Sequence, residues 1–519
     1  MMTGTLSFIL SHKTYFACFL CSLVLVLLLT PLVGKLAQKL GAIDLPNHRK
    51  VHTAPTPQMG GLAIYFAMWL PILGLYFWEN AINVRLEERW WDIAVIAMAG
   101  AAMALSGILD DLKGLTATKK LLVQVPLAYL FAKYIANFKN ITVPGIGSFD
   151  LGPWGPPLTI LWIVGITNAL NLVDGIDGLA TGVAVVIAFT NSIIAMISGN
   201  DFLAIVMLGM AGACLGFLYY NFAPAKIFLG DTGSLFLGMT LAATSVLTFS
   251  KSDITASFLV SVVVLGYPAM DTLLAMARRK IYGRPMFSAD LGHIHHRLLA
   301  KGFDHPKASL LAYALCVAFS VLALAMVLQN SIATFFSLAL VAGMVSAGLY
   351  YLDFFKLLNP GEIKKTKANY IIAYHLGELL NAKLTLADNL TKIHDLFKQA
   401  CWEFGFLSMT VRLDPILIGS DENREMVWAN PLHNLQNARP SKLAEESLTA
   451  PGGFLEVEYN YDPAEMDDEL AREYRMQMTR LVNSAALRIR ELMPLLARTQ
   501  KQADASSRNL PESRSEISR

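Results

Sequence analysis

Two amides and two carboxylates stand close together in the stretch NALNLVDGIDGLATG, which runs from Asn168 to Gly182. Asn168 and Asn171 are three positions apart, as are Asp174 and Asp177, so each pair can face one way on a helical turn. Long apolar runs flank the stretch, and ionisable residues beside a membrane segment usually face a cavity, a metal ion or a substrate. These residues are therefore the first candidates for a functional site.

Three more carboxylates adjoin apolar runs. Asp110 and Asp111 lie in GILDDLKGL, where one of two repelling neighbours can serve as a base or the pair can hold a cation. A solvated helix end is the alternative. Asp231 stands between two glycines in FLGDTGS, where backbone N–H groups and a helix N-terminus can bind phosphate. There the alternative is a helix N-cap formed by Asp231 or Thr232.

Three histidines occur within four residues in GHIHHRLLAKG: His293, His295 and His296, followed by Arg297. Adjacent histidines point to different sides of a helix, no cysteine is near, and basic neighbours disfavour a cation, so a zinc site is the less favoured alternative. Arginine and imidazole donors suit phosphate oxygens, and we predict an anion site. The basic loop with Arg49 and Lys50 either joins that site or is an ordinary positively charged cytoplasmic loop.

The composition places these motifs in a membrane protein. Of 519 residues, 54% are hydrophobic and 16% charged, which is too apolar for a soluble protein of this length. The net charge of +2 gives no sign of a nucleic-acid partner, and none is expected. Carboxylates, amides and a basic loop on one face of a membrane bundle suit Mg²⁺, which bridges carboxylates to substrate phosphates. The acceptor in such a site would be a lipid.

Apolar runs of about 20 residues predict an all-α polytopic domain over residues 1–355 with about eleven transmembrane helices. They lie near Tyr15–Val33, Gly60–Phe77, Ile93–Leu109, Leu121–Ala136, Leu158–Leu172, Leu179–Ile197, Phe202–Tyr219, Leu235–Phe249, Ala256–Ala277, Leu310–Leu328 and Ile332–Leu352. Lysine and arginine are concentrated in the loops after odd-numbered spans. The N-terminus is therefore expected outside, and the C-terminus and every polar motif on the cytoplasmic side.

A small cytoplasmic α+β domain is predicted over residues 364–498. Its expected elements are a helix over Asn369–Phe397, strands over Ser408–Leu413 and Phe454–Tyr461, and a helix from Glu465 to about Met493, ahead of Pro494. Residues 499–519 are polar, and we predict a disordered tail there.

The motifs in their order resemble the polyprenyl-phosphate N-acetylhexosamine-1-phosphate transferases, the superfamily of the MraY, WecA and TagO enzymes. The matching pieces are MGG at Met59, DDLKGL at Asp110, NALNLVDGIDGLATG at Asn168, FLGDTGS at Phe228 and HIHHRL at His293. The resemblance implies transfer of a sugar 1-phosphate from a UDP-sugar to a polyprenyl phosphate, with release of UMP. It also implies a requirement for Mg²⁺, with Mn²⁺ as an alternative ion.

The resemblance also implies roles for individual residues. Asp231 would be the principal metal ligand, with Asn171 close by. Asp110 and Asp111 match a pair assigned either to deprotonation of the lipid phosphate or to nucleophilic attack, and one-step and two-step mechanisms both stay open.

The remaining matches concern substrate binding. Asp177 and Phe228 match positions that hold uracil, and Asp174 lies between nucleotide and metal. Lys120 resembles a lysine near the acceptor phosphate, with Lys119 as the alternative alignment. Asn168 belongs to the substrate-binding stretch, and the histidines with Arg297 match a loop that grips the diphosphate and sugar.

The run HIHHRLLAKG looks like the WecA and TagO type, which favours UDP-N-acetylglucosamine or a related donor over UDP-MurNAc-pentapeptide. The acceptor would be undecaprenyl phosphate in the bacterial inner membrane, where the product initiates a glycan such as lipopolysaccharide O-antigen, capsule or a teichoic-acid-like polymer. The C-terminal domain departs from this type and faintly resembles a GAF-like sensor domain. Regulation, recruitment of a partner and stabilisation of a homodimer are the roles open to it.

Two other functions fit parts of the pattern. Intramembrane carboxylates also mark ion pathways in transporters, but these carboxylates cluster at one face and no charged residue is expected at mid-span, which favours interfacial catalysis. A membrane-anchored sensor with a degenerate transferase core is opposed by the intact acidic positions and histidine segment.

Overall fold

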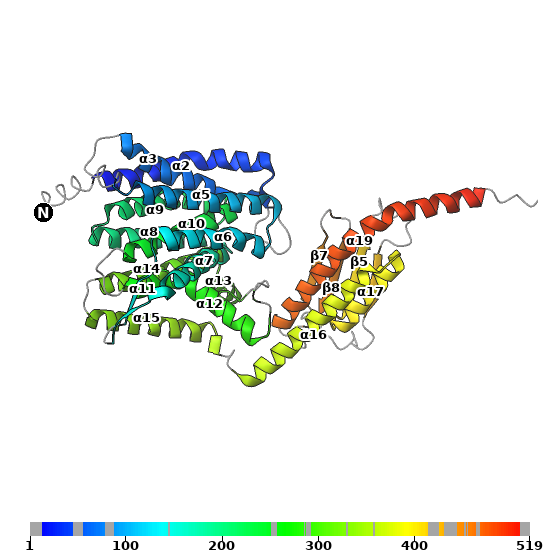
Figure 1. The fold of residues 1–519 in the computed structure, drawn as a ribbon. Helices are drawn as coiled ribbons and strands as arrows, with labels where there is room; N and C mark the ends of the chain where they lie inside the picture. The colour runs from blue at the N-terminus through cyan, green and yellow to red at the C-terminus, as the bar shows by residue number, and fades with distance from the viewer. Residues whose placement is uncertain are drawn as a thin grey trace, which may run out of the picture. The chain divides into compact units, whose positions relative to one another are not determined.

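The computed structural model describes residues 13–44, 55–77, 88–143, 146–250, 257–284, 286, 292–327, 331–355, 359–413, 425–429, 444–450, 453, 455–462 and 468–508. Arg49 and Lys50 of the predicted basic loop lie outside these ranges. The chain divides into two compact units, a helical unit of residues 1–279 and 285–355 and a C-terminal unit of residues 280–284 and 356–519 (Figure 1).

Among the described residues, eight helices are long and apolar enough to cross a membrane, or nine if one bent pair is a single crossing. The eight are α2 (Lys13–Leu40), α3 (Gly60–Gly74) with the short η1 (Leu75–Phe77), α5 (Trp90–Lys113), α7 (Gly155–Val173) with η2 (Gly152–Trp154), α8 (Leu179–Ile197), α9 (Asp201–Asn221), α14 (His305–Val327) and α15 (Ser331–Tyr351). Two further helices, α6 (Ala117–Tyr134) and α10 (Gly230–Ser250), fall on the other two predicted spans. The polytopic class is thus supported, whereas the count of about eleven and the sidedness stay predictions.

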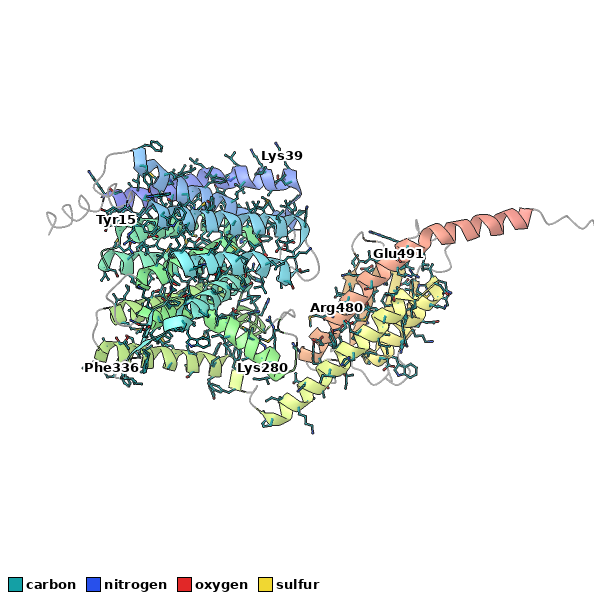
Figure 2. All side chains as sticks on the ribbon, in the orientation of Figure 1. Tyr15, Lys39, Lys280, Phe336, Arg480 and Glu491 are labelled. Atoms are coloured by element: carbon teal, nitrogen blue, oxygen red, sulfur yellow. The ribbon has the colours of Figure 1, made fainter. Side chains whose placement is uncertain are left out.

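The first helix shows why lipid must surround this unit. One face of α2 packs into the bundle, with Val26 fully buried, while Leu20, Leu28 and Leu32 on the other face are 55%, 63% and 60% exposed. Figure 2 labels Tyr15 and Lys39 near the two ends of this helix and shows its side chains directed both into the bundle and outward. An apolar face of this length would be unfavourable in water, so it is expected to contact lipid.

The predicted span Ala256–Ala277 falls on a bent pair of helices, because the chain turns there by 82° between α11 (Ser257–Val264) and α12 (Gly266–Ile281). Pro268 lies in the first turn of α12, where a missing backbone N–H costs nothing, so a new helix can begin at this point. The short α13 (Ile294–Ala300) carries the histidine segment and packs beside α14.

Close helix packing positions the start of α10. A Cβ atom on Gly61 of α3 would overlap the backbone of Gly233, and one on Gly107 of α5 would overlap the backbone of Asp231. Glycine therefore lets two neighbouring helices approach the first turn of α10 directly. The hairpins β1 (Ile43–Asp44) with β2 (Thr56–Pro57), and β3 (Asn140–Val143) with β4 (Gly147–Asp150), complete this unit.

The C-terminal unit is an antiparallel sheet packed with helices around one apolar core. Its elements are α16 (Pro360–Thr385), α17 (Leu390–Glu403), β5 (Ser408–Leu413), β6 (Glu425–Ala429), β7 (Ala444–Thr449), β8 (Leu455–Tyr461) and α19 (Asp468–Arg508). The strand order is β6-β5-β8-β7, with Val411 of β5 opposite Val457 of β8. The predicted strand Ser408–Leu413 is confirmed, and the second predicted strand is confirmed over Leu455–Tyr461, while Phe454 lies outside the described residues.

Several predicted boundaries here are corrected. The single helix over Asn369–Phe397 is two helices, because Asn389 caps α17 by accepting the Lys392 N–H at 2.9 Å. Strands β6 and β7 were not predicted, so the order helix, strand, strand, helix is incomplete. Helix α19 also continues past Pro494 to Arg508, within the predicted disordered tail, because one proline removes a single hydrogen bond from a long helix. Residues 509–519 lie outside the described ranges.

Candidate active site

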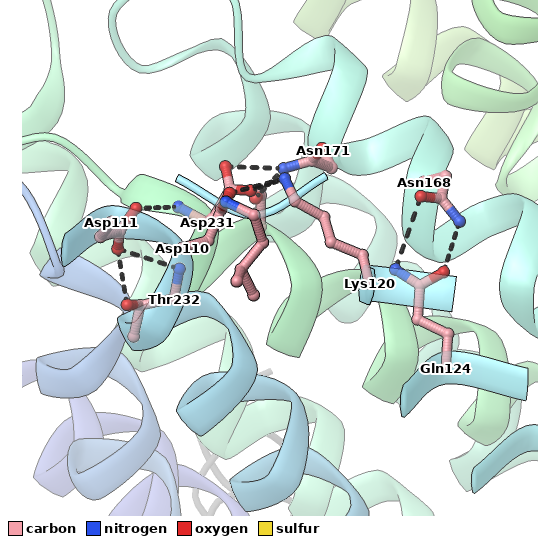
Figure 3. Close-up of polar contacts among 10 residues, drawn as sticks. Asp110, Asp111, Lys120, Gln124, Asn168, Asn171, Asp231 and Thr232 are labelled. Atoms are coloured by element: carbon pink, nitrogen blue, oxygen red, sulfur yellow. Dashed lines mark hydrogen bonds and ion pairs between the residues drawn. The ribbon is translucent and has the colours of Figure 1, made fainter. Parts of the chain in front are cut away.

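The start of α10 is capped by a carboxylate from another helix. Asp111, at the end of α5, accepts the N–H of Asp231 at 2.8 Å and that of Thr232 at 3.2 Å, and the Thr232 hydroxyl donates to it at 2.6 Å (Figure 3). A negative charge here satisfies unpaired backbone donors and complements the helix dipole. The cap predicted from Asp231 or Thr232 is thus supplied by Asp111, and the Asp231 side chain is left for other contacts.

The Asp231 carboxylate lies at the centre of a polar network. Asn171 of α7 donates to its Oδ1 at 2.9 Å, and the Lys120 ammonium of α6 pairs with its Oδ2 (Figure 3). Lys120 also pairs with Asp110 Oδ2 at 2.6 Å, so a single ammonium joins the ends of α5 and α10. Lys119 is exposed, which favours Lys120 over Lys119 as the match to the lysine near the acceptor phosphate.

A cavity of about 1020 Å³ opens beside this network. The predicted site residues that line it are Asp110, Asp111, Asp174, Asp177, Phe228, Asp231 and His296. Lys120, Asn168, Asn171, His293, His295 and Arg297 are not among its lining residues. The cavity is therefore acidic, and a single histidine of the predicted trio reaches its wall.

The loop between α7 and α8 carries Asp174 and Asp177. Asp177 Oδ2 accepts the Ala225 N–H at 2.9 Å and so ties this loop to the segment before α10. Burial, together with the negative charges of Asp231, Asp111 and Asp177, holds the pKa of Asp174 well above its usual value. A bound cation would favour the ionised form of Asp174.

Asn168 joins two helices. Its side-chain amide donates to Gln124 Oε1 at 2.6 Å and to the Val164 carbonyl at 2.7 Å, and Gln124 lies one turn beyond Lys120 on α6 (Figure 3). Asn168 therefore positions the helix that carries Lys120. Sequence reasoning missed Gln124, whose only signal was an amide in an apolar run.

A buried carboxylate anchors the histidine helix. Asp271 of α12 is 1% exposed, and its Oδ2 lies 2.7 Å from His293 Nδ1 while its Oδ1 accepts the Ile294 N–H at 2.7 Å. Asp271 lies inside the predicted span Ala256–Ala277, nearer to its middle than to its end, so the expectation that no charged residue sits at mid-span is wrong. An acidic residue in an apolar run was the signal for this missed residue.

His295 is enclosed between its neighbours. Its ring lies parallel to that of His293 at 5.7 Å and tilted against that of His296 at 4.3 Å, and it packs on Gly175. Neither ring nitrogen has a hydrogen-bond partner within the described part of the chain. Burial, reinforced by the neighbouring His296, lowers the pKa of His295 to about 3, so the ring is neutral at physiological pH.

Arg297 contacts the end of α15. Its guanidinium donates to the Leu352 carbonyl at 2.8 Å and lies over the Phe354 ring at 4.1 Å, while Nε donates to the Gly292 carbonyl at 3.3 Å. These contacts hold α13 in place through cation–π and hydrogen-bond interactions. In this structure the side chain stabilises the fold around the histidines, and it does not line the cavity.

The donor set fits a divalent cation. Within the described residues, no three His, Cys, Asp or Glu side chains converge as preformed metal ligands, and Lys120 lies between Asp110 and Asp231. Yet six carboxylates, Asp44 and the five predicted ones, line one cavity, and an anionic substrate could not approach them without added positive charge. Oxygen donors from Asp231 and Asn171 match the preference of Mg²⁺.

Comparisons with known proteins agree with this picture. Residues 93–249 match the family described as Glycosyl transferase family 4. The chain is 40% identical over 307 residues to the probable undecaprenyl-phosphate N-acetylglucosaminyl 1-phosphate transferase of Bacillus subtilis, covering 59% of this chain and 83% of that protein. It is 37% identical over 308 residues to the decaprenyl-phosphate N-acetylglucosaminephosphotransferase of Mycobacterium tuberculosis, covering 54% and 74%.

A more distant relative is the phospho-N-acetylmuramoyl-pentapeptide-transferase of Levilactobacillus brevis, at 34% identity over 261 residues, covering 48% of this chain and 77% of that protein. The chain belongs to the family of polyprenyl-phosphate N-acetylhexosamine-1-phosphate transferases. The predicted superfamily and its WecA and TagO type are thereby confirmed, and the chain is an enzyme of the phosphotransferase class.

Proposed function

We propose that this protein transfers N-acetylglucosamine 1-phosphate from UDP-N-acetylglucosamine to undecaprenyl phosphate and releases UMP. The observation that carries the proposal is the acidic cavity at the junction of α5, α7 and α10, which six carboxylates line and where Lys120 pairs with two of them, Asp110 and Asp231. The names of the relatives support this donor sugar and a polyprenyl phosphate acceptor.

The reaction is a displacement at phosphorus. An oxygen of the lipid phosphate attacks the sugar-bearing phosphorus of the donor, a new P–O bond forms, and the bond to the UMP oxygen breaks. Asp110 accepts the remaining proton of the acceptor phosphate, and Lys120, already paired with Asp110, neutralises that phosphate. Asp111 is a poor nucleophile here, because hydrogen bonds commit both its oxygens to the start of α10. These contacts favour the one-step mechanism.

Asp231 and Asn171 would hold a Mg²⁺ ion, which when bound supplies charge stabilisation to the diphosphate. Mn²⁺ is the alternative ion. Asp177 and Phe228, which also line the cavity, hold the uracil, and His296 donates to the sugar phosphate. Asp174, a further lining carboxylate, would be ionised with the cation bound.

The active site faces the cytoplasm of a bacterium, and the protein spans its inner membrane with the N-terminus outside. The concentration of basic residues in the loops after odd-numbered predicted spans supports this orientation. The product would initiate a cell-surface glycan.

The proposal is tested by UMP release from purified protein given undecaprenyl phosphate, Mg²⁺ and a panel of UDP-sugars. Product is expected with UDP-N-acetylglucosamine and not with UDP-MurNAc-pentapeptide. Release should stop when EDTA removes the metal and return on addition of Mg²⁺. Asp92→Ala, at the opposite end of α5 from Asp110, is the control and should retain activity. UMP release that does not need the lipid would refute the assigned acceptor.

A further inference from the structure

Helix α16 has two apolar faces, although a helix in a small soluble unit needs only one. The inner face is buried in the core of the C-terminal unit and repeats at alternating spacings of three and four residues. Its members are Tyr370, Ala373, Gly377, Leu380 and Leu384, with Ala387 just past the end of the helix. This face joins α16 to α19 and accounts for the folding of the unit.

The outer face follows the same spacing but is exposed. Its members, called the outer stripe below, are Ala368, Ile372, His375, Leu379 and Ala382 of α16, with Leu386 at the C-cap position directly after the helix. Ile372, Leu379 and Leu386 are 58%, 49% and 78% exposed. An apolar stripe with this repeat, exposed within the described part of the chain, is the pattern by which one helix packs along another.

Charges beside the outer stripe indicate which helix would cover it. If Ile372, Leu379 and Leu386 are the first positions of a heptad, Glu378 and Lys383 occupy the two flanking positions that face each other across a parallel pair of identical helices. Glu378 now lies 3.7 Å from Arg480, and that pair is 55% exposed on both sides, so its contribution is small. Figure 2 labels Arg480 on α19, the neighbour of α16.

The membrane unit imposes the same direction on two copies. Two copies in one membrane share an orientation, so a two-fold axis relating them lies along the membrane normal, and equivalent helices along that axis run parallel. Confinement to the bilayer also raises the effective concentration of one α16 for another. The parallel arrangement is the one that places Glu378 of one copy beside Lys383 of the other.

We propose that the outer stripe of α16 pairs with the same stripe of a second copy as a parallel two-stranded coiled coil. His375 occupies an inner position near the middle of the stripe, where a polar residue favours one register over its neighbours. The C-terminal unit then contributes a dimerisation helix, and this inference does not depend on the donor sugar or the acceptor.

Cysteine cross-linking in native membranes tests the contact. Ala382→Cys is made in a Cys21→Ser background, because Cys21 is the exposed cysteine of the five. Oxidation should yield a disulfide-linked dimer, while the matched variant Lys398→Cys, on the exposed surface of α17, should yield little. Absence of the Ala382→Cys dimer overturns the proposal. If the thiol of that variant also fails to react with a maleimide, the outer stripe is covered by something other than a second copy.

Charge reversal tests the parallel register. Glu378→Lys and Lys383→Glu should each lower the dimer fraction in nanodiscs, and the double variant should restore it. Leu379→Lys should lower it by more than about tenfold, because a charge would be buried at the helix contact. If the stripe instead lay on the lipid surface, Glu378→Lys would strengthen its attachment and the double variant would restore nothing. That result, in protein with an unchanged circular dichroism spectrum, overturns the proposal.

Discussion

The carboxylates at the start of α10 and the histidines of α13 approach one cavity, but their surroundings differ. On the acidic side Asp110 and Asp231 line the cavity and share the Lys120 ammonium. On the histidine side His295 is fully enclosed and neutral, and His296 is the member of the trio that lines the cavity. Motif residues of one kind can therefore divide into those that line the cavity and those that hold the lining residue in place.

The acidic side should carry the largest effect. Asp231→Ala removes one acceptor from each of Asn171 and Lys120 and the main oxygen donor to the proposed cation, so kcat should fall by at least about a thousandfold. The measurement is single-turnover UMP release at saturating Mg²⁺. Retention of most activity would mean that the metal binds elsewhere and that the acidic side is not the side on which activity depends most.

Substitutions of Asp111 distinguish a structural role from a catalytic role on the acidic side of the cavity. Asp111→Asn keeps one acceptor oxygen for the start of α10 but loses a charge, so kcat should fall about a hundredfold and stability by about 1 kcal/mol. Asp111→Ala should cost about 2 kcal/mol. Both are read from kinetics and thermal unfolding in detergent. A kinetic loss without any loss of stability would assign Asp111 to the chemistry.

Asp271 should act through His293. Asp271→Asn can still accept the Ile294 N–H but loses the charge beside the imidazole, so kcat/KM should fall by about ten- to a hundredfold. His293→Gln should cost a similar amount, and the double variant little more, with an interaction energy above about 0.5 kcal/mol. Additive effects would show that the two residues act independently. A shifted pH–rate profile in Asp271→Asn would show that Asp271 positions His293, because a simple loss of folded protein would lower the rate equally at every pH.

The two adjacent histidines should respond in opposite ways. His296→Ala should lower kcat/KM about tenfold with little change in stability, whereas His295→Leu should keep the packing and alter the pH dependence of stability. Because the folded pKa of His295 lies near 3, below its usual 6.5, the neutral ring's contribution is complete above pH 6.5 and is lost as pH falls toward 3. Thermal unfolding from pH 5 to 8 should show this loss in the unmodified protein and not in His295→Leu.

The smallest effect should come from removing the C-terminal unit. None of the residues that line the cavity belongs to residues 365–519, so their deletion should change kcat by less than about threefold. Residues 280–284 pack with that unit, including Arg284 over the Tyr370 ring, so a stability loss of about 1 kcal/mol is expected. UMP release per folded molecule is the readout. Complete loss of activity in folded protein would give this unit a catalytic role.

Much of the fold was predictable because it depends on local properties of the chain. Runs such as Leu179–Ile197 are long and apolar, and a helix is the structure that satisfies their backbone in lipid. Bends and short strands were harder. The 82° turn between α11 and α12 lies inside a continuous apolar run, and β6 and β7 are held by pairing with distant strands. Pairing across the sheet leaves a weak signal in the sequence of one strand.

The candidate site was likewise predictable where it depends on local properties of the chain and not where it depends on distant contacts. Residue types and spacing by themselves predicted an acidic site suited to Mg²⁺ and phosphate with a basic histidine segment, because the chemistry of carboxylates, amides and imidazoles does not depend on the fold. The family resemblance added the phosphotransferase class. The tertiary structure decided which of them meet. Asp111 reaches Asp231 across 120 positions, and Arg297 is committed to the Leu352 carbonyl 55 positions away. Such contacts arise from the packing of whole helices, so no local spacing encodes them.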